Sequence, residues 1–364
     1  MKKINIEISN APTCYDIIIA ENSINKIDNF ISNKSKYSKI VLIFDSNIDS
    51  NIVDIFKKIF NDIVCIPINL ELNKKKSFNL FLDIQSKLIE YNFDKDLLIL
   101  SLGGGSIGDL VGFIASTYKR GINYIQIPTT LLGMLDSSIG GKTGIDSRDG
   151  KNLIGTFYHP ELVFIDINFL STLKKEEITS GIFEAIKYGV ALDSDLFLFI
   201  NENKEDLYNI DILKKIIEWC CEIKTNIIVK DEKDKGLRNK LNFGHTIGHA
   251  VESNALQNGG DLLHGEAVAV GMAVETILSQ TTHDLSEDEC GIILASLKGI
   301  FPLQAIAESK LPDLIEWMRH DKKNDDSKIN FTLLKKIGEA EFNKTCSEDQ
   351  IEAAIKKYNS FLNF

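Results

Sequence analysis

The stretch that decides the fold is LLILSLGGGSIGDLVGF, residues 97–113. Its first six residues, LLILSL, form a run apolar on both faces of an extended chain, which is typical of a strand in the middle of a covered sheet. After the first six of these residues come three consecutive glycines, Gly103 to Gly105, and the remaining residues have the apolar spacing of a helix. The stretch therefore predicts a buried strand that passes into a helix through a glycine loop.

Similar strand-like runs lie on both sides of this stretch. They are KIVLIFD (39–45), IVCIPIN (63–69), YIQIP (124–128) and LVFID (162–166), and helical patterns occupy 51–60, 77–91 and 108–121. Such alternation of strands and helices is typical of a parallel sheet covered by helices. We expect an α/β, Rossmann-like domain over residues 1–170.

The pattern changes after about residue 170. Apolar residues then recur almost throughout at helical spacing, and only INFTLL, residues 329–334, looks extended. A chain of 364 residues is also too long for one comfortable core. The sequence therefore predicts a second, all-α domain over residues 171–364.

Composition excludes several classes of function. The net charge of −11 argues against a nucleic-acid partner, because phosphate backbones require a basic face. No apolar run approaches the length of a membrane span, and the start moves directly into alternating residues without a secretion signal. The six cysteines are scattered without CxxC spacing, which favours free thiols in a reducing cytoplasm.

The glycine loop has two possible roles. Gly103, Gly104 and Gly105 would let backbone N–H groups approach a phosphate at a helix N-terminus, or they form a tight turn without a ligand. Asp109 could simply compensate the helix dipole. Gly140 and Gly141 precede Lys142, but the GxxxxGK[ST] frame is absent, which argues against an ATP-type loop.

Three of the six histidines lie close together in NFGHTIGHAVE (242–252) and LLHGEAVAVGM (262–272). His245 and His249 share one helical face, so they could bind a metal or be surface residues, and His264 could be an ordinary helix N-terminal residue. Glu184 precedes Lys187 by one turn, which indicates either an ion pair or a ligand at a covered surface.

Several basic and amide side chains form a possible anion site. Singly, each of them fits a solvated surface, whereas together they could bind a substrate with both a carboxylate and a phosphate. They are Lys142, Lys151, Asn152, Lys224, Arg238, Asn242, Lys322 and Lys323.

In order and spacing, seven motifs between about residues 40 and 335 closely resemble the 3-dehydroquinate synthase family of sugar-phosphate cyclases. They are GGGSIGDLVGFIASTYKRG, IPTTLLGMLDSSIGGKTGID, GKNLIGTFYHP, EAIKYG, DEKDKGLRNKLNFGHTIGHAVE, LLHGEAVAVGM and HDKK. The resemblance implies an α/β NAD-binding domain (1–170) followed by a helical metal- and substrate-binding domain (171–364). It also implies conversion of 3-deoxy-D-arabino-heptulosonate 7-phosphate to 3-dehydroquinate and phosphate in the shikimate pathway of aromatic amino acid biosynthesis.

The resemblance also implies cofactors and roles. NAD would be used catalytically together with a divalent metal, usually zinc with cobalt as an alternative, held by Glu184, His245 and His264. His249 would instead belong to the substrate's hydrogen-bonding network. The NAD residues would be Asp45, Asn47, Gly103, Gly104, Gly105, Ser106, Asp109, Thr129, Thr130, Lys142, Lys151 and Thr172. The substrate residues would be Asp136, Lys142, Asn152, Lys187, Lys224, Arg238, Asn242, His249 and Lys322. Arg120 would complete the neighbouring subunit's phosphate site, which implies a homodimer.

Two positions depart from the family pattern. Asn73 stands where relatives often carry an acidic residue, although Glu71 is near enough to replace it. Asp234 stands where an active-site glutamate is usual, so its reach is one methylene shorter.

Three rival functions follow from the same features. A different sugar-phosphate cyclase, making a deoxy-inosose or a valiolone, would have no use for carboxylate-binding residues such as Arg238. A metal-dependent polyol dehydrogenase would have no use for phosphate-binding lysines. A catalytically silent NAD-binding or regulatory protein would not need the whole set of acid, base and metal residues.

Overall fold

The structure is a computed structural model that describes residues 1–7, 14–31, 34–70, 76–147, 150–260, 262–319 and 329–363. The chain divides into two compact units, Met1–Leu173 with Lys224–Lys233, and Lys174–Ile223 with Asp234–Phe364. The division passes through the long helix α7 (Ile210–Lys230), whose last residues group with the first unit. The two functional domains expected at 1–170 and 171–364 remain a prediction.

The first unit is built on a seven-stranded sheet in the order β1-β2-β9-β6-β5-β3-β4. Neighbouring strands are parallel, except that β1 pairs antiparallel with β2. The strands are β1 (Lys2–Glu7), β2 (Cys14–Ala20), β3 (Lys39–Asp45), β4 (Val64–Ile68), β5 (Leu97–Gly103), β6 (Asn123–Pro128) and β9 (Leu162–Asp166). The five strands expected from apolar runs are confirmed, and the antiparallel edge is an addition to them.

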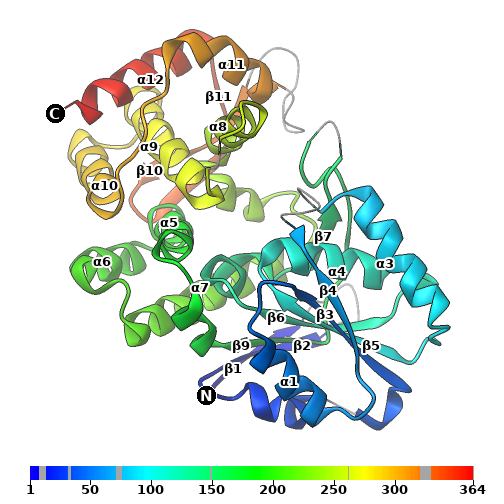
Figure 1. The fold of residues 1–364 in the computed structure, drawn as a ribbon. Helices are drawn as coiled ribbons and strands as arrows, with labels where there is room; N and C mark the ends of the chain where they lie inside the picture. The colour runs from blue at the N-terminus through cyan, green and yellow to red at the C-terminus, as the bar shows by residue number, and fades with distance from the viewer. Residues whose placement is uncertain are drawn as a thin grey trace. The chain divides into compact units, whose positions relative to one another are not determined.

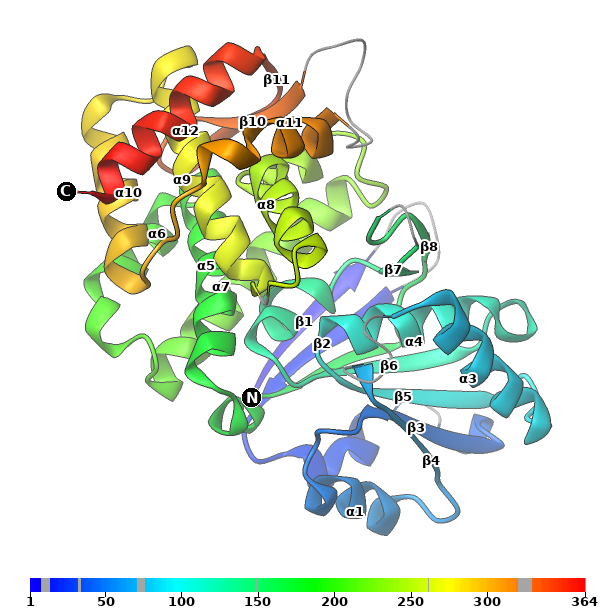
Figure 2. The same ribbon diagram turned by 45° about the horizontal axis from the view of Figure 1, so that its top comes forward.

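Helices cover both faces of this sheet (Figure 2). Val41, Ile43 and Ile99 pack with helices α3 and α4 in one apolar core, and the alternate residues Leu42 and Leu98 are equally buried on the opposite face. The α-helices of this unit are α1 (Ser50–Ile59), α3 (Phe78–Glu90) and α4 (Gly105–Thr117). Its short helical turns are η1 (Ile24–Phe30), η2 (Lys34–Lys36), η3 (Tyr118–Arg120), η4 (Gly133–Ser137) and η5 (Ile167–Thr172), and a hairpin joins β7 (Lys142–Ile145) to β8 (Ile154–Phe157).

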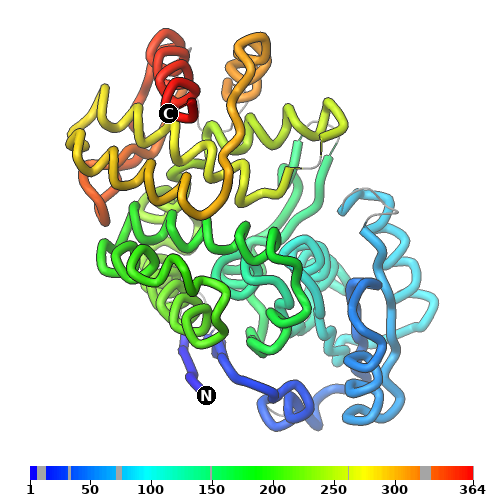
Figure 3. Tube along the Cα trace, turned by 60° about the vertical axis from the view of Figure 1, so that its left-hand side comes forward, coloured from blue at the N-terminus to red at the C-terminus, as the bar shows by residue number. Residues whose placement is uncertain are grey.

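The second unit is largely helical (Figures 1 and 3). Helix α9 (His264–Thr282) is apolar on nearly every side, so it forms the centre of the unit and contacts α5, α8, α10 and α12. The other helical elements are α5 (Lys175–Leu192), α6 (Ser194–Glu202), η6 (Lys204–Asp206), α7, η7 (Leu237–Asn242), α8 (His245–Gln257), α10 (Glu287–Ile300), η8 (Glu308–Lys310), α11 (Leu311–Arg319) and α12 (Glu348–Leu362).

A hairpin of β10 (Ile329–Lys336) and β11 (Glu339–Cys346) also belongs to this unit, which is therefore not all-α. The apolar run at 329–334 indicated β10, whereas β11 is mostly polar and gave no strand pattern. Among the described helices, none combines the length and hydropathy needed to cross a lipid bilayer.

Candidate active site

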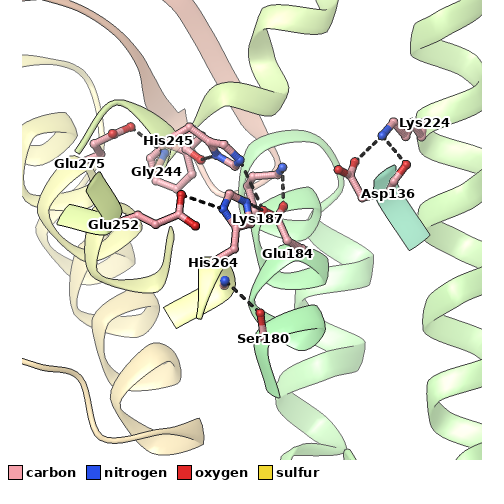
Figure 4. A network of polar contacts seen from close by, with 12 residues as sticks. Asp136, Ser180, Glu184, Lys187, Lys224, Gly244, His245, Glu252, His264 and Glu275 are labelled. Atoms are coloured by element: carbon pink, nitrogen blue, oxygen red, sulfur yellow. Dashed lines mark hydrogen bonds and ion pairs between the residues drawn. The ribbon is translucent and has the colours of Figure 1, made fainter. Parts of the chain in front are cut away.

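Three helices of the second unit bring Glu184, His245 and His264 together (Figure 4). Glu184 lies in the middle of α5, and the two histidines are the first residues of α8 and α9. Glu184 Oε1 lies 3.4 Å from His245 Nε2 and 3.3 Å from His264 Nε2. The sequence spacing places only His245 and His249 on the same helix. Tertiary packing brings α5, with Glu184, and α9, with His264, to the start of α8.

The geometry of these three side chains fits a zinc site. Two ligand atoms bound about 2.0–2.1 Å from a tetrahedral zinc ion lie roughly 3.3 Å apart, close to the separations found here. Glu184 is only 1% exposed, and neither of its oxygens makes a hydrogen bond of good geometry among the described residues. The Lys187 ammonium faces Oε2, whereas Oε1 faces the two imidazoles, and a buried carboxylate oxygen in such a place favours a cation or a proton beside it. The donor set of one carboxylate and two imidazoles is also one that zinc accepts.

The charges around Glu184 are strongly coupled. Burial alone would raise the pKa of this carboxyl, but the Lys187 ammonium and His245 hold the pKa well below its usual range. Burial and Lys187 lower the pKa of His245, which favours its neutral imidazole. Burial also opposes protonation of His264, yet Glu184 and Glu252 outweigh it and raise the pKa of His264 to about 9.

His249 lies beside the same group. A nitrogen of each of His245, His249 and His264 can lie within 4.8 Å of the others, so three histidines form an alternative donor set. His249 is exposed, however, and its ring centroid lies 5.9 Å from that of His264. Lys187 Nζ contacts Glu184 Oε2 at 2.5 Å, so the ion pair considered from the sequence is present and is buried.

Further contacts orient the two histidines. His245 Nδ1 lies 3.2 Å from the Phe243 carbonyl oxygen, and His264 Nδ1 lies 3.5 Å from Glu252 Oε2. Contacts of this kind fix the orientation of imidazole ligands at metal centres. Ser180 Oγ, one turn before Glu184 on α5, accepts the Gly265 N–H at 2.9 Å and ties the start of α9 to α5 (Figure 4).

In the first unit, the expected dinucleotide residues gather where parallel strands end. The register pairs Phe44 with Leu102 and Gly103 with Pro128, so Asp45, the glycine loop and Thr129 lie along one edge. The Thr129 N–H donates to the Gly103 carbonyl at 3.0 Å, and the Asn47 N–H donates to Asp45 Oδ1 at 2.9 Å. This is the edge at which open α/β sheets bind ligands.

A small hollow lies beside the glycine loop. Helix α4 begins at Gly105 without a side-chain cap, so its first N–H groups remain available to an anion. The hydroxyls of Ser137 and Ser138 are buried and make no hydrogen bond among the described residues. The lining residues are Gly103, Gly104, Gly105, Gly108, Gln126, Pro128, Gly133, Ser137 and Ser138. Buried hydroxyls and uncapped N–H groups are donors of the kind that bind a phosphate. The two serines were not recognised from the sequence, although DSSIGGK places them beside candidate residues.

Lys76 is another residue that sequence analysis missed. Its ammonium contacts Asp109 and donates to Asn152 Oδ1 at 2.5 Å, and the lysine itself is 5% exposed. Burial raises the pKa of the Asp109 carboxyl, and Lys76 opposes that rise. Asp109 is therefore more than a compensator of the helix dipole, because it anchors a buried lysine beside the loop.

Lys224 and Asp136 form another contact of the first unit. Lys224 Nζ lies 2.5 Å from Asp136 Oδ1 and 2.6 Å from the Asp136 carbonyl oxygen, and Lys224 is 4% exposed (Figure 4). In the second unit Arg238 is 3% exposed within η7, and Asn242 Nδ2 donates to Asn239 Oδ1 at 3.1 Å. These residues are held in place rather than being freely solvated surface.

The remaining candidates lie elsewhere in the two units. Thr172 is exposed and donates to the Phe169 carbonyl, while Lys142 and Lys151 are exposed. Arg120, Asn152 and Asp234 have φ of 68°, 55° and 57°, the left-handed region that non-glycine residues rarely adopt and that recurs at functional sites. Glu71, Asn73, Lys322 and Lys323 lie outside the described residues.

Comparison with known proteins decides the family. The model of the 3-dehydroquinate synthase N-terminal domain matches residues 68–180, and that of the C-terminal domain matches residues 181–324. A 3-dehydroquinate synthase of Pelagibacter ubique is 36% identical over 98% of this chain and 99% of its own length. The chain belongs to the 3-dehydroquinate synthase family. Another family member, from Pseudoalteromonas translucida, is 44% identical over 78% of this chain and 80% of its own length.

Solved structures extend the likeness in fold. A 2-deoxy-scyllo-inosose synthase complexed with carbaglucose-6-phosphate, NAD+ and Co2+ is 24% identical and has a TM-score of 0.85, covering 98% of this chain and 100% of the other. A 2-epi-5-epi-valiolone synthase from Streptomyces hygroscopicus with NAD+ and Zn2+ bound gives the same identity and TM-score over 98% and 99% of the two chains. The α/β unit with a largely helical remainder is therefore the fold of sugar-phosphate cyclases.

Proposed function

We propose that this protein is a 3-dehydroquinate synthase that converts 3-deoxy-D-arabino-heptulosonate 7-phosphate to 3-dehydroquinate and phosphate. The observation that carries the proposal is the convergence of Glu184, His245 and His264 in a chain whose relatives are named for this activity. Curated relatives with this name are 36–44% identical, whereas the similar inosose and valiolone synthases are 24% identical. The difference favours dehydroquinate over the products of the other cyclases.

Glu184, His245 and His264 would hold a divalent cation, and the residues around the glycine loop would hold NAD. When bound, NAD supplies a transient hydride acceptor, and zinc or cobalt supplies Lewis-acid polarisation of the substrate hydroxyls. The protein's part is to position one flexible substrate through successive steps, which is mainly a matter of geometry and electrostatics.

The cationic side chains would bind the substrate's two anionic groups. Arg238 offers a planar fork for a carboxylate, and a buried fork loses little freedom on binding. Asp136 holds the Lys224 ammonium through two contacts, so this charge is oriented before substrate arrives. Lys142, Lys187, Asn152, Asn242, His249 and Lys322 complete the proposed substrate set, with Asp45, Asn47, Ser106, Thr130, Lys151 and Thr172 assigned to NAD.

We also propose a homodimer in the cytoplasm. Arg120 is exposed and has a φ of 68°, so its guanidinium is accessible to a second subunit and its backbone adopts a conformation that recurs at functional sites. The six cysteines are free thiols, which suits a reducing compartment. Mixing an Arg120→Ala protein with a Lys142→Ala protein should restore part of the activity that each lacks, since a mixed dimer contains one intact site. Failure of every mixture to regain activity would exclude the shared site.

The decisive experiment is phosphate release from the heptulosonate phosphate with NAD well below the substrate concentration. We expect many turnovers per NAD, no accumulation of NADH, and loss of turnover on chelation. No phosphate release with NAD and metal present would exclude the proposed function.

The same assay separates the rival functions. Turnover of a phosphorylated sugar without a carboxylate would indicate another cyclase. Stoichiometric NADH from a polyol would indicate a dehydrogenase; the fold is similar to that of a probable glycerol dehydrogenase of Sinorhizobium meliloti, with a TM-score of 0.68. Binding of NAD without any turnover would indicate a silent or regulatory protein.

A further inference from the structure

A buried glutamate contacts the backbone next to one of the candidate metal ligands, His245. Glu275, in the middle of α9, has no exposed surface. Its Oε2 accepts the Gly244 N–H at 2.6 Å, and its Oε1 accepts the Ile247 N–H at 3.1 Å. Figure 4 shows this carboxylate reaching the residue before His245. A carboxylate with no exposed surface is retained only when specific partners satisfy it.

The two N–H groups belong to the start of α8. This helix begins at His245, and the residue before it, Gly244, has a φ of 79° and provides no side-chain cap. The first N–H groups of a helix have no partner within the helix and favour a negative charge. Glu275 therefore supplies from α9 the cap that the sequence of α8 lacks, and it fixes the backbone on both sides of His245.

Backbone packing leaves α8 little freedom to move against α9. A Cβ atom on Gly271, one turn before Glu275, would lie 2.6 Å from the Gly248 nitrogen and overlap the Gly244 carbonyl oxygen. A Cβ on Gly248 would lie 3.1 Å from the Ala267 carbonyl oxygen. The two helices thus meet backbone to backbone, and the Glu275 carboxylate fixes the start of α8, which carries His245, against the middle of α9.

We propose that Glu275 is a positioning residue for the metal site, holding His245 Nε2 at the separation from Glu184 and His264 that a bound cation needs. The inference rests on the proposed function, in which these three residues bind the metal. Glu275 would not touch the cation itself and would act through the backbone N–H groups of Gly244 and Ile247. Contacts that orient ligands in this way commonly change metal affinity by about 10- to 100-fold when removed.

The test measures cobalt binding to the metal-free protein by visible absorption, without any assay of activity. Glu275→Gln keeps the size of the side chain, but its amide NH2 group would face one of the two backbone N–H groups that the carboxylate accepts. We therefore expect the Co2+ affinity to be about 10- to 100-fold weaker and the absorption spectrum of bound cobalt to change. Glu289→Gln is the matched control. Glu289 lies on another helix, α10, and its Oε1 also accepts a backbone N–H, that of Ile337, at 3.0 Å. We expect its cobalt affinity to equal that of the wild type.

The outcomes separate this inference from the proposed function. Wild-type protein that binds no cobalt would reject the metal site itself. Wild-type binding with equal affinity in Glu275→Gln would overturn the positioning role, even if the variant unfolds at a lower temperature. If Glu275→Gln does not fold, Glu275→Asp retains the charge with a shorter reach, and the same affinity comparison applies to it.

Discussion

Lys187 Nζ lies 2.5 Å from Glu184 Oε2, one turn further along α5, and the two side chains are 2% and 1% exposed. Each charge compensates the other in a place that water hardly reaches. In such a pair, removal of one partner leaves an uncompensated buried charge, which costs about 3–5 kcal/mol. A metal ion bound by Glu184 would provide a second source of compensation.

Replacement of Lys187 by methionine should show whether a bound metal can compensate the Glu184 charge in place of the lysine. We expect the metal-free Lys187→Met protein to lose about 3 kcal/mol of unfolding free energy, because Glu184 is left without its ammonium partner. Zinc should then raise the melting temperature of the variant more than that of the wild type. Urea denaturation and thermal unfolding, each with and without zinc, measure both quantities.

A matched control comes from α12, where Lys356 Nζ lies 3.9 Å from Glu352 and both side chains are exposed. Lys356→Met should change stability by no more than about 0.5 kcal/mol. Equal zinc-induced shifts in the wild type and Lys187→Met would contradict the compensation by metal.

Removal of each histidine should distinguish the two possible ligand sets. His245→Ala and His264→Ala should each lose tightly bound zinc, since both imidazoles lie 3.3–3.4 Å from the same Glu184 oxygen. His249→Ala should retain zinc while losing turnover. Zinc content after dialysis, measured by elemental analysis, gives the answer. Zinc lost from His249→Ala but kept by Glu184→Gln would instead support three histidine ligands.

The sequence predicted most of the α/β unit because its central strands are apolar runs that can be recognised from their own residues. LLILSLG is apolar except at Ser101, and β5 is buried over its whole length. Strand β11, EAEFNKTC, alternates weakly and exposes several polar residues, so its pairing with β10 arises from tertiary structure and not from its own sequence. The hairpin of β7 and β8 was missed for the same reason, because β8 is largely exposed.

The candidate site was predictable in its residue types but not in its supports. The histidine spacing and the family resemblance indicated His245 and His264, whereas Glu275 was not recognised. Its only sequence signal is a charged residue inside the otherwise apolar run AVAVGMAVETIL, residues 267–278. A charge at such a position requires a buried partner, and only the packing of α8 against α9 reveals that the partner is the backbone before His245.

The glycine loop gives a test of dinucleotide binding in the first unit. A Cβ atom on Gly105 would overlap the Ser137 hydroxyl, so Gly105→Ala should displace the serine and narrow the hollow. We expect NAD affinity to fall by about tenfold or more, because the substitution should cost roughly one hydrogen bond to a charged phosphate group. Fluorescence titration with NADH measures this change, and cobalt binding in the other unit should not change.

Gly291→Ala is the control for this substitution. A Cβ at Gly291, on the exposed face of α10, meets nothing within 4 Å, so the change should stabilise the helix by about 0.5–1 kcal/mol. Unaltered NADH affinity in Gly105→Ala would argue against the loop as the phosphate site.

The His159–Glu232 contact should make the stability of the first unit depend on pH. Glu232 Oε1 lies 2.9 Å from His159 Nε2, and it also contacts Lys233. Burial would raise the pKa of Glu232, but these partners hold it below its ordinary value of 4.5. A carboxyl whose folded pKa is depressed stabilises the protein above its unfolded pKa and loses that contribution as pH falls through the folded pKa.

Glu232→Gln should therefore reduce the unfolding free energy by about 1 kcal/mol at neutral pH, a value kept small by solvent screening. The difference from the wild type should shrink as pH falls below about 4, where the wild-type carboxyl takes up its proton. Urea denaturation across this pH range measures the trend, with Glu352→Gln on α12 as an exposed control. A difference that stays constant with pH would show that the glutamine acts through packing, because only loss of the charge at Glu232 produces a difference that protonation removes.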